Sequence, residues 1–158
     1  MFDWREQMDA FEDVSAYSEF SNELTAFQDG EPLLITGTQV VGNFFTTLGV
    51  SPMMGRTFRM EETWDGQDDG IVISHALWVN YFGSDPDVIG KRIEFAIGDG
   101  EVLGVMPRGF RFPSEQIQFW GTYGWDSGAS GETWFRRAHF VRAFMHLAPG
   151  VSHAEADA

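Results

Sequence analysis

Glycine and proline interrupt this chain so often that only short secondary-structure elements can form. The 158 residues include 18 Gly and 6 Pro. Turn signals fall at Asp29-Gly30 and at Gly98-Asp99-Gly100, and Gly and Ser dominate residues 121–132. The apolar segments between them fall short of the roughly 20 residues that a membrane-spanning helix needs. The length suits one domain, or two small lobes that share a core.

The expected elements are mostly strands. Alternating or β-rich patterns predict extended segments over residues 14–27, 32–41, 70–74, 92–97, 101–106 and 135–149. Two short helices are expected over residues 42–50 and 75–83, and they should end at Gly49 and Gly83 in the left-handed conformation. Asp85 followed by Pro86 predicts a further helical start. This mixture of hairpins and a few helices indicates an α+β fold.

The composition excludes several classes of function. The formal net charge is −14, from 24 acidic and 10 basic side chains, so the chain should repel the phosphates of nucleic acids and of anionic lipid surfaces. The absence of cysteine removes disulfides, thiol catalysis and cysteine-based zinc sites. We therefore expect neither a nucleic-acid partner nor a zinc-cysteine centre.

The histidines and acidic residues do not form a recognisable catalytic or metal-binding motif. His139 and His146 are seven residues apart on an expected strand, so they should face opposite sides. The acidic segment 65–70, "DGQDDG", resembles the start of a calcium loop, but it lacks the glutamate at position twelve and is better explained as a solvated loop. Ser127 lacks the G-x-S-x-G frame of a hydrolase nucleophile. We expect a protein without catalytic activity, metal or cofactor.

The stretch 104–113, "GVMPRGFRFP", looks like a shaped corner at the end of a strand. Proline has no N–H to donate, so Pro107 should end the preceding strand, and glycine permits the chain to reverse. The two phenylalanines should anchor the corner, while the two arginines face solvent. Arginine beside aromatic residues is also enriched at protein interfaces, so four residues are candidates for contact with a partner. They are Arg108, Phe110, Arg111 and Phe112.

A second possibility is a ligand-binding or sensing module. Aromatic side chains often line the clefts that take apolar ligands. The candidates for such a wall are Trp120, Tyr123, Trp125 and Trp134. A protein of this size could equally use them to build its core, and the sequence leaves both alternatives open.

Several blocks of sequence, in this order, resemble the MacB-like periplasmic core domains of ABC transporter permeases. The blocks are "FDWREQMDAFEDVSAY", "VVGNFFTTLGVSPMMGRTF", "IVISHALWVNYFGSDPDVIGKRI", "GVMPRGFRFP" and "LAPGVSHAEA". The resemblance implies a porter-like lobe, a mixed sheet with helices, that carries an inserted smaller strand-rich lobe. It assigns residues 1–60 and 136–158 to the porter-like lobe, and 61–135 to the insert together with the Gly/Ser-rich loop.

The same resemblance implies a place and a role. The domain would lie at the periplasmic face of a bacterial inner membrane, as the soluble part of a membrane protein whose chain continues beyond both ends. It would couple cytoplasmic ATP hydrolysis to a conformational change outside the membrane, for export or for handling a lipoprotein or other partner. The implied partners are the flanking transmembrane helices, a second permease protomer, a cytoplasmic ATPase domain or subunit, and a periplasmic adaptor or lipoprotein.

Overall fold

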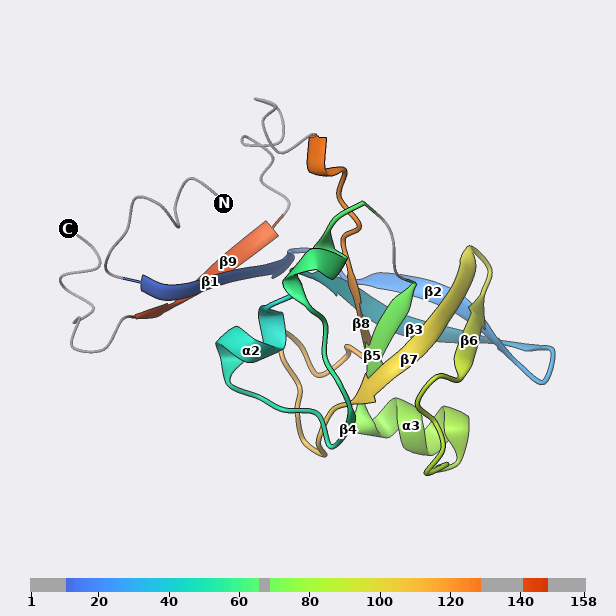
Figure 1. The fold of residues 1–158 in the computed structure, drawn as a ribbon. Helices are drawn as coiled ribbons and strands as arrows, with labels where there is room; N and C mark the ends of the chain where they lie inside the picture. Colours follow the sequence, from blue (N-terminus) through green and yellow to red (C-terminus); the bar gives the residue numbers. More distant parts are fainter. Residues whose placement is uncertain (1–10, 66–68, 129–140, 148–158) are drawn as a thin grey trace.

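The computed structural model describes residues 11–65, 69–128 and 141–147, and strands dominate it (Figure 1). The strands are β1 (Phe11–Ser18), β2 (Asn22–Gln28), β3 (Glu31–Val40), β4 (Met54–Gly55), β5 (Gly70–Ile73), β6 (Arg92–Phe95), β7 (Gly98–Val105), β8 (Phe119–Thr122) and β9 (Val141–Leu147). The helices are α2 (Phe44–Leu48), the 3-10 helix η1 (Met60–Thr63) and α3 (His75–Phe82). The expected α+β class is confirmed in this sheet-dominated form with few helices.

Most of the strands close into a ring. β2 pairs with β6, β6 with β7, β7 with β5, β5 with β8, β8 with β3, and β3 again with β2. The pairings β3–β8 and β5–β7 are parallel and the others in the ring are antiparallel. Closing a sheet on itself removes exposed strand edges and produces a stiff body.

The strands β1 and β9 form a two-stranded ribbon that extends away from the ring (Figure 1). They run antiparallel, from the pair Phe11–Leu147 at one end to the pair Ser18–Val141 at the other. The ribbon joins the ring where β1 pairs with β3 at Tyr17 and Val40. The first and last described strands therefore begin and end side by side.

β1 and β2 both pair with β3, one after the other along its length, and a short irregular segment separates them. Residues 14–27 were expected to be one extended segment, but residues 19–21 leave the sheet between the two strands. β2 pairs with β3 from Gln28 to Asn22, and β1 takes over the pairing only at Tyr17. The interruption leaves Thr38 and Gln39 of β3 without a paired residue in β1 or β2.

Two hairpins were predicted, and both are present. Asp29 and Gly30 take φ values of 52° and 83°, the left-handed conformation that a tight two-residue hairpin turn requires. The second hairpin turns at Ala96 and Ile97, because Phe95 pairs with Gly98. The prediction of a turn at residues 98–100 was wrong, since those residues already belong to β7.

The two predicted helices begin and end where local chemistry directs them. Ser74 caps α3, because its Oγ accepts a hydrogen bond of 3.1 Å from the Leu77 N–H. Gly49 ends α2 and Gly83 ends α3, both in the left-handed conformation, as predicted. The Asp85-Pro86 pair begins a turn and not the expected helix. There the Asp85 carbonyl accepts a bond from Trp78 Nε1, and its carboxylate is engaged by the Asp87 N–H and by Lys91.

The buried side chains form two clusters on either side of the sheet. One cluster belongs to the ring and α3 and includes Ile35, Ile73, Leu77, Ile93 and Val102. The other lies between the sheet, α2 and the chain that connects β7 to β8. It is mainly aromatic, with Phe44, Phe45, Phe58 and Trp120 at its centre. The candidate contact segment packs against this second cluster.

An ion pair between Arg56 and the buried Glu62 links the end of β4 to η1. Glu62 is only 8% exposed. Its carboxylate accepts two bonds from the Arg56 guanidinium, of 2.8 and 3.0 Å, and one of 2.8 Å from the Arg59 N–H. Burial alone would raise the pKa of Glu62. The hydrogen bonds and charges of Arg56 and Arg59 outweigh burial, so the pKa lies below its ordinary value of 4.5.

Replacing Glu62 with glutamine is expected to destabilise the protein by about 1–2 kcal/mol at pH 7, because the charge-assisted bonds are lost. The native pKa lies below that of the unfolded chain, so the ionised carboxylate stabilises the fold above pH 4.5 and loses this effect as the pH falls through the native pKa. Denaturant titrations of both proteins at several pH values would measure the difference. The difference in free energy of unfolding between the two proteins should shrink as the pH falls below 4.5. The exposed neighbour Glu61, replaced in the same way, should show no comparable difference at any pH.

The sheet crosses the boundary expected between the two lobes. β2 and β3, from the segment 1–60, pair with β6 and β8 from the segment 61–135. The ribbon of β1 and β9 joins the first segment to the segment 136–158. The division into a porter-like lobe and an insert remains a prediction.

Candidate functional site

The candidate contact segment forms the corner between β7 and β8. β7 ends at Val105, two residues before Pro107, as predicted. Gly109 takes a φ of 91°, and the Phe110 N–H bonds to the Pro107 carbonyl at 3.1 Å, which closes a tight turn. The chain then returns along the aromatic cluster and enters β8 at Phe119.

The two phenylalanines anchor this corner, as the sequence predicted. The Phe110 ring lies 5.8 Å from that of Phe45 and 5.4 Å from that of Trp120. The Phe112 ring contacts the rings of Tyr17, Phe44 and Phe144 at centroid distances of 5.3–6.0 Å. Contacts of this kind add to the free energy of burial, so the corner is fixed firmly to the core.

The two arginines of the corner face solvent. Arg108 is exposed, and Arg111 forms an ion pair of 3.1 Å with Glu115 while 62% of its side chain stays accessible. Exposed ion pairs contribute little to stability. The arginines are therefore free of a demanding structural role, and their contact with a partner remains a prediction.

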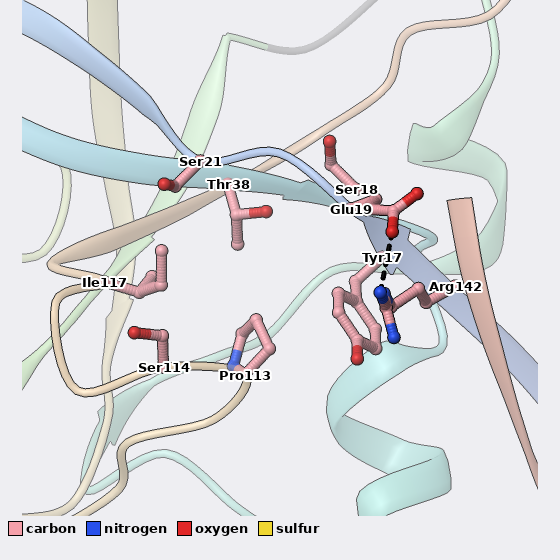
Figure 2. A pocket seen from close by; sticks show the side chains of 9 residues that line it. All are labelled: Tyr17, Ser18, Glu19, Ser21, Thr38, Pro113, Ser114, Ile117 and Arg142. Atoms are coloured by element: carbon pink, nitrogen blue, oxygen red, sulfur yellow. Dashed lines mark hydrogen bonds and ion pairs between the residues drawn. The ribbon is translucent and has the colours of Figure 1, made fainter. Parts of the chain in front are cut away.

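A pocket of about 330 Å³ lies beside this corner, where the ribbon meets the ring (Figure 2). Its walls come from the end of β1, the interruption that follows, β3, the segment after Phe112, and β9. The lining residues are Tyr17, Ser18, Glu19, Ser21, Thr38, Pro113, Ser114, Ile117 and Arg142. Sequence reasoning missed this pocket, because its residues come from separate segments without a common motif.

An ion pair stands at the edge of the pocket. Arg142 of β9 donates a hydrogen bond of 2.6 Å to Glu19 Oε1, and Figure 2 shows the two side chains meeting above Tyr17. The bond to Glu19 and the charge of that carboxylate raise the pKa of Arg142 above its ordinary value. The pair thus carries no net charge, and it links the ribbon to the interruption between β1 and β2.

The acidic and histidine candidates have other partners. Asp65 accepts a bond of 2.9 Å from the Ser127 N–H, and Asp69 pairs with Arg92. His75 packs edge-to-face on Trp78 at 5.4 Å, and His146 is exposed on β9. His139 and His153 lie outside the described residues. Among the residues that the structure describes, no three His, Cys, Asp or Glu side chains come close enough together to hold a metal ion.

The aromatic residues proposed as a cleft wall do not all share one environment. Trp120 is fully buried in the core. Tyr123 stacks on Trp125 at 4.3 Å, and Trp125 contacts Trp64 at 5.6 Å. Burial raises the pKa of Tyr123 to about 12. Trp134 lies outside the described residues. Of the two alternatives that the sequence left open, Trp120 follows the core alternative, and the ligand-binding module stays a prediction.

The sequence matches the MacB-like periplasmic core domain family over residues 2–158. The chain belongs to this family. The resemblance inferred from the sequence blocks is thereby confirmed. A MacB-like periplasmic core domain is the extracytoplasmic part of an ABC transporter permease. Within the described residues, no helix combines the length and the apolar character of a membrane span.

Solved structures of MacB-like domains share the fold. The periplasmic region of MacB from Actinobacillus actinomycetemcomitans superposes with a TM-score of 0.71 at 12% identity, over 98% of this chain and 66% of that one. A permease-protein domain from Porphyromonas gingivalis superposes with a TM-score of 0.66 at 18% identity, over 98% of this chain and 63% of that one. The extracellular domain of the ABC-type transporter YknZ from Gram-positive bacteria superposes with a TM-score of 0.57 at 20% identity, over 73% of this chain and 56% of that one.

The MacB-like chain described here spans between 56% and 66% of the length of these three structures. At these identities the likeness establishes the fold and not a shared partner or substrate. A comparison with curated proteins found no match.

Proposed function

We propose that this MacB-like domain couples ATP hydrolysis in the cytoplasm to a conformational change outside the membrane, as part of an ABC transporter permease. The observation that carries the proposal is the family match over residues 2–158. The domain works by contact and motion and not by catalysis. Its output is export, or the handling of a lipoprotein or another partner.

The arrangement of the ribbon supports this role. Phe11 and Leu147 are paired, so β1 begins beside the residue at which β9 ends. A displacement applied at this end of the ribbon would reach the ring through the Tyr17–Val40 pairing. The closed ring resists bending, and it would pass such a displacement on to whatever contacts its surface.

The proposed partners follow the same arrangement. They are the flanking transmembrane segments, a second permease protomer, a cytoplasmic ATPase domain or subunit, and a periplasmic adaptor or lipoprotein. Arg108, Phe110, Arg111 and Phe112 are proposed to contact the outer partner. In this proposal the two arginines meet the partner directly, and the two phenylalanines fix the corner that presents them.

Fractionation of the native organism tests the placement. An antibody against the chain should detect a polypeptide in the cytoplasmic-membrane fraction, and protease added outside spheroplasts should remove the epitope. A cytoplasmic control protein must survive the same treatment. Recovery of the antigen in the cytosol, or its protection from external protease, would contradict the proposal.

A charge swap tests the role of Arg111. A photo-crosslinking residue at the exposed position Gln116 of the native permease should give an adduct with the outer partner. Both Arg111→Glu and the swap Arg111→Glu/Glu115→Arg should lower the adduct yield about tenfold, which corresponds to about 1.4 kcal/mol at an interface arginine. If the swap restored the adduct yield, the loss in Arg111→Glu would come from the broken Arg111–Glu115 ion pair. That result would contradict a direct contact between Arg111 and the partner.

A further inference from the structure

Thr38 lies in β3, between the residues that pair with β2 and the residue that pairs with β1. Gly37 still pairs with Asn22 of β2, and Val40 pairs with Tyr17 of β1. The intervening residues 19–21 leave the sheet. The gap that they open becomes the pocket of about 330 Å³ between the ribbon, the ring and the corner.

The Thr38 hydroxyl is buried without a hydrogen-bond partner in the described part of the chain. Thr38 is 3% exposed, and its Oγ1 has no hydrogen-bond donor or acceptor within reach among the described residues. In Figure 2 this hydroxyl lies on the side of Tyr17 and Glu19, which line the pocket together with Thr38. Nearly all buried polar groups in proteins are satisfied, so an unpaired hydroxyl at the wall of a pocket offers a hydrogen-bonding position to a ligand group or to an ordered water.

The rest of the lining combines apolar surface with polar groups. Tyr17, Pro113 and Ile117 surround the hollow and provide apolar contact (Figure 2). Glu19 and Arg142 provide an acceptor and several donors at the edge, within a pair that is already neutral. The volume lies at the lower end of the range typical of small-molecule pockets.

We propose that this pocket binds a small neutral polyhydroxylated ligand with the chemistry of a single sugar ring. Such a ligand donates to Glu19, accepts from Arg142 and pairs with Thr38 Oγ1, while its C–H faces pack on Tyr17 and Ile117. An anion would have to displace Glu19 from Arg142, and a cation would have to displace Arg142 from Glu19. An apolar ligand would leave the Thr38 hydroxyl unsatisfied. This inference goes beyond the proposed transport function and rests on different residues.

Titration of the purified 158-residue chain, followed by two-dimensional NMR of its backbone amides, tests the proposal. The probes are D-glucose and N-acetyl-D-glucosamine, with sodium phosphate, sodium acetate and putrescine as charged controls. At least one sugar should give saturable shifts centred on Glu19, Thr38 and Ser114. Phosphate, acetate and putrescine should give none at the same concentrations.

Two substitutions make the result specific to the pocket. Thr38→Val keeps the shape of the side chain and removes its hydroxyl, so it should weaken sugar binding at least fivefold without lowering the melting temperature. Arg142→Gln should weaken binding by a similar factor through the edge of the pocket. Thr25→Val, on β2 and outside the lining, is the matched control and should bind as the natural chain does.

Three outcomes would overturn the inference. They are the absence of saturable shifts with either sugar, stronger binding of a charged probe than of a sugar, and sugar binding that survives both Thr38→Val and Arg142→Gln. If Thr38→Val fails to fold, the Arg142→Gln variant decides the question by itself.

Discussion

Replacing Trp120 with alanine is expected to destabilise this MacB-like domain by about 3–5 kcal/mol. Trp120 is fully buried, and its ring contacts those of Phe45 at 5.6 Å and Phe110 at 5.4 Å. Its backbone pairs with Thr38 on one side and with Val72 on the other, so the neighbours cannot move in to fill the cavity. Denaturant unfolding would measure the loss, and the melting temperature should fall by on the order of 10 °C.

Two control substitutions accompany Trp120→Ala. The first distinguishes the packing of the Trp120 ring from the hydrogen bond of its N–H, and the second removes an exposed aromatic ring. Trp120 Nε1 donates to the Phe112 carbonyl at 3.1 Å, so Trp120→Phe keeps an aromatic ring but loses this bond. It should cost about 1–2 kcal/mol. Phe20 is 64% exposed, and Phe20→Ala should change stability by about 0.5 kcal/mol or less. A loss below about 1 kcal/mol for Trp120→Ala would contradict the central position given to this side chain.

The features that could be predicted from the sequence are those decided within a few residues of chain. Gly49 and Gly83 end their helices because glycine takes the left-handed conformation without strain. The Asp29-Gly30 turn follows from the same property. Pro107 follows the end of β7 because it lacks the N–H that a paired strand uses. The family resemblance supplied the rest of the expected fold.

The closed ring could not be predicted from periodicity. Its closure depends on pairings such as Gly37–Phe119 and Ala26–Phe95, between residues far apart in the sequence. Alternation of apolar residues indicates a strand but not its neighbour or register. The second hairpin illustrates the limit. Gly98-Asp99-Gly100 has turn-forming composition, but the pairing of β6 with β2 and β7 moves the turn to Ala96 and Ile97.

The candidate site divides in the same way. The anchoring of Phe110 and Phe112 could be predicted, because Pro107 and Gly109 indicate a turn and two phenylalanines beside a turn can fix it to the core. The pocket could not be predicted, because the sequence around Thr38 is that of an ordinary strand. The pocket forms only because residues 19–21 lie outside the sheet in the folded protein. Its unpaired hydroxyl is a property of the assembled fold, and no local pattern records it.

Replacing Gly42 with alanine is expected to destabilise the domain by about 3 kcal/mol, at the upper end of the range for overpacking. A Cβ at position 42 would lie 2.0 Å from the Arg59 carbonyl oxygen and 2.8 Å from Met60 Cα. All of the closest atoms belong to the backbone, so no side-chain rotation relieves the clash. The Gly42 N–H also donates to Thr63 Oγ1 at 2.7 Å. Moving η1 away would break this bond, and denaturant unfolding would measure the total loss.

Gly121 provides the matched control for the substitution at Gly42. A Cβ at Gly121 would meet no atom within 4 Å, and the residue already has a backbone conformation open to alanine. Gly121→Ala should therefore be neutral, or stabilising by about 0.4–1 kcal/mol, because alanine restricts the unfolded chain. Gly104→Ala should resemble Gly42→Ala, since its Cβ would lie 2.2 Å from the Arg56 carbonyl oxygen. Equal stability of the Gly42→Ala and Gly121→Ala proteins would show that the chain between β4 and η1 is not held against the sheet as closely as its contacts indicate.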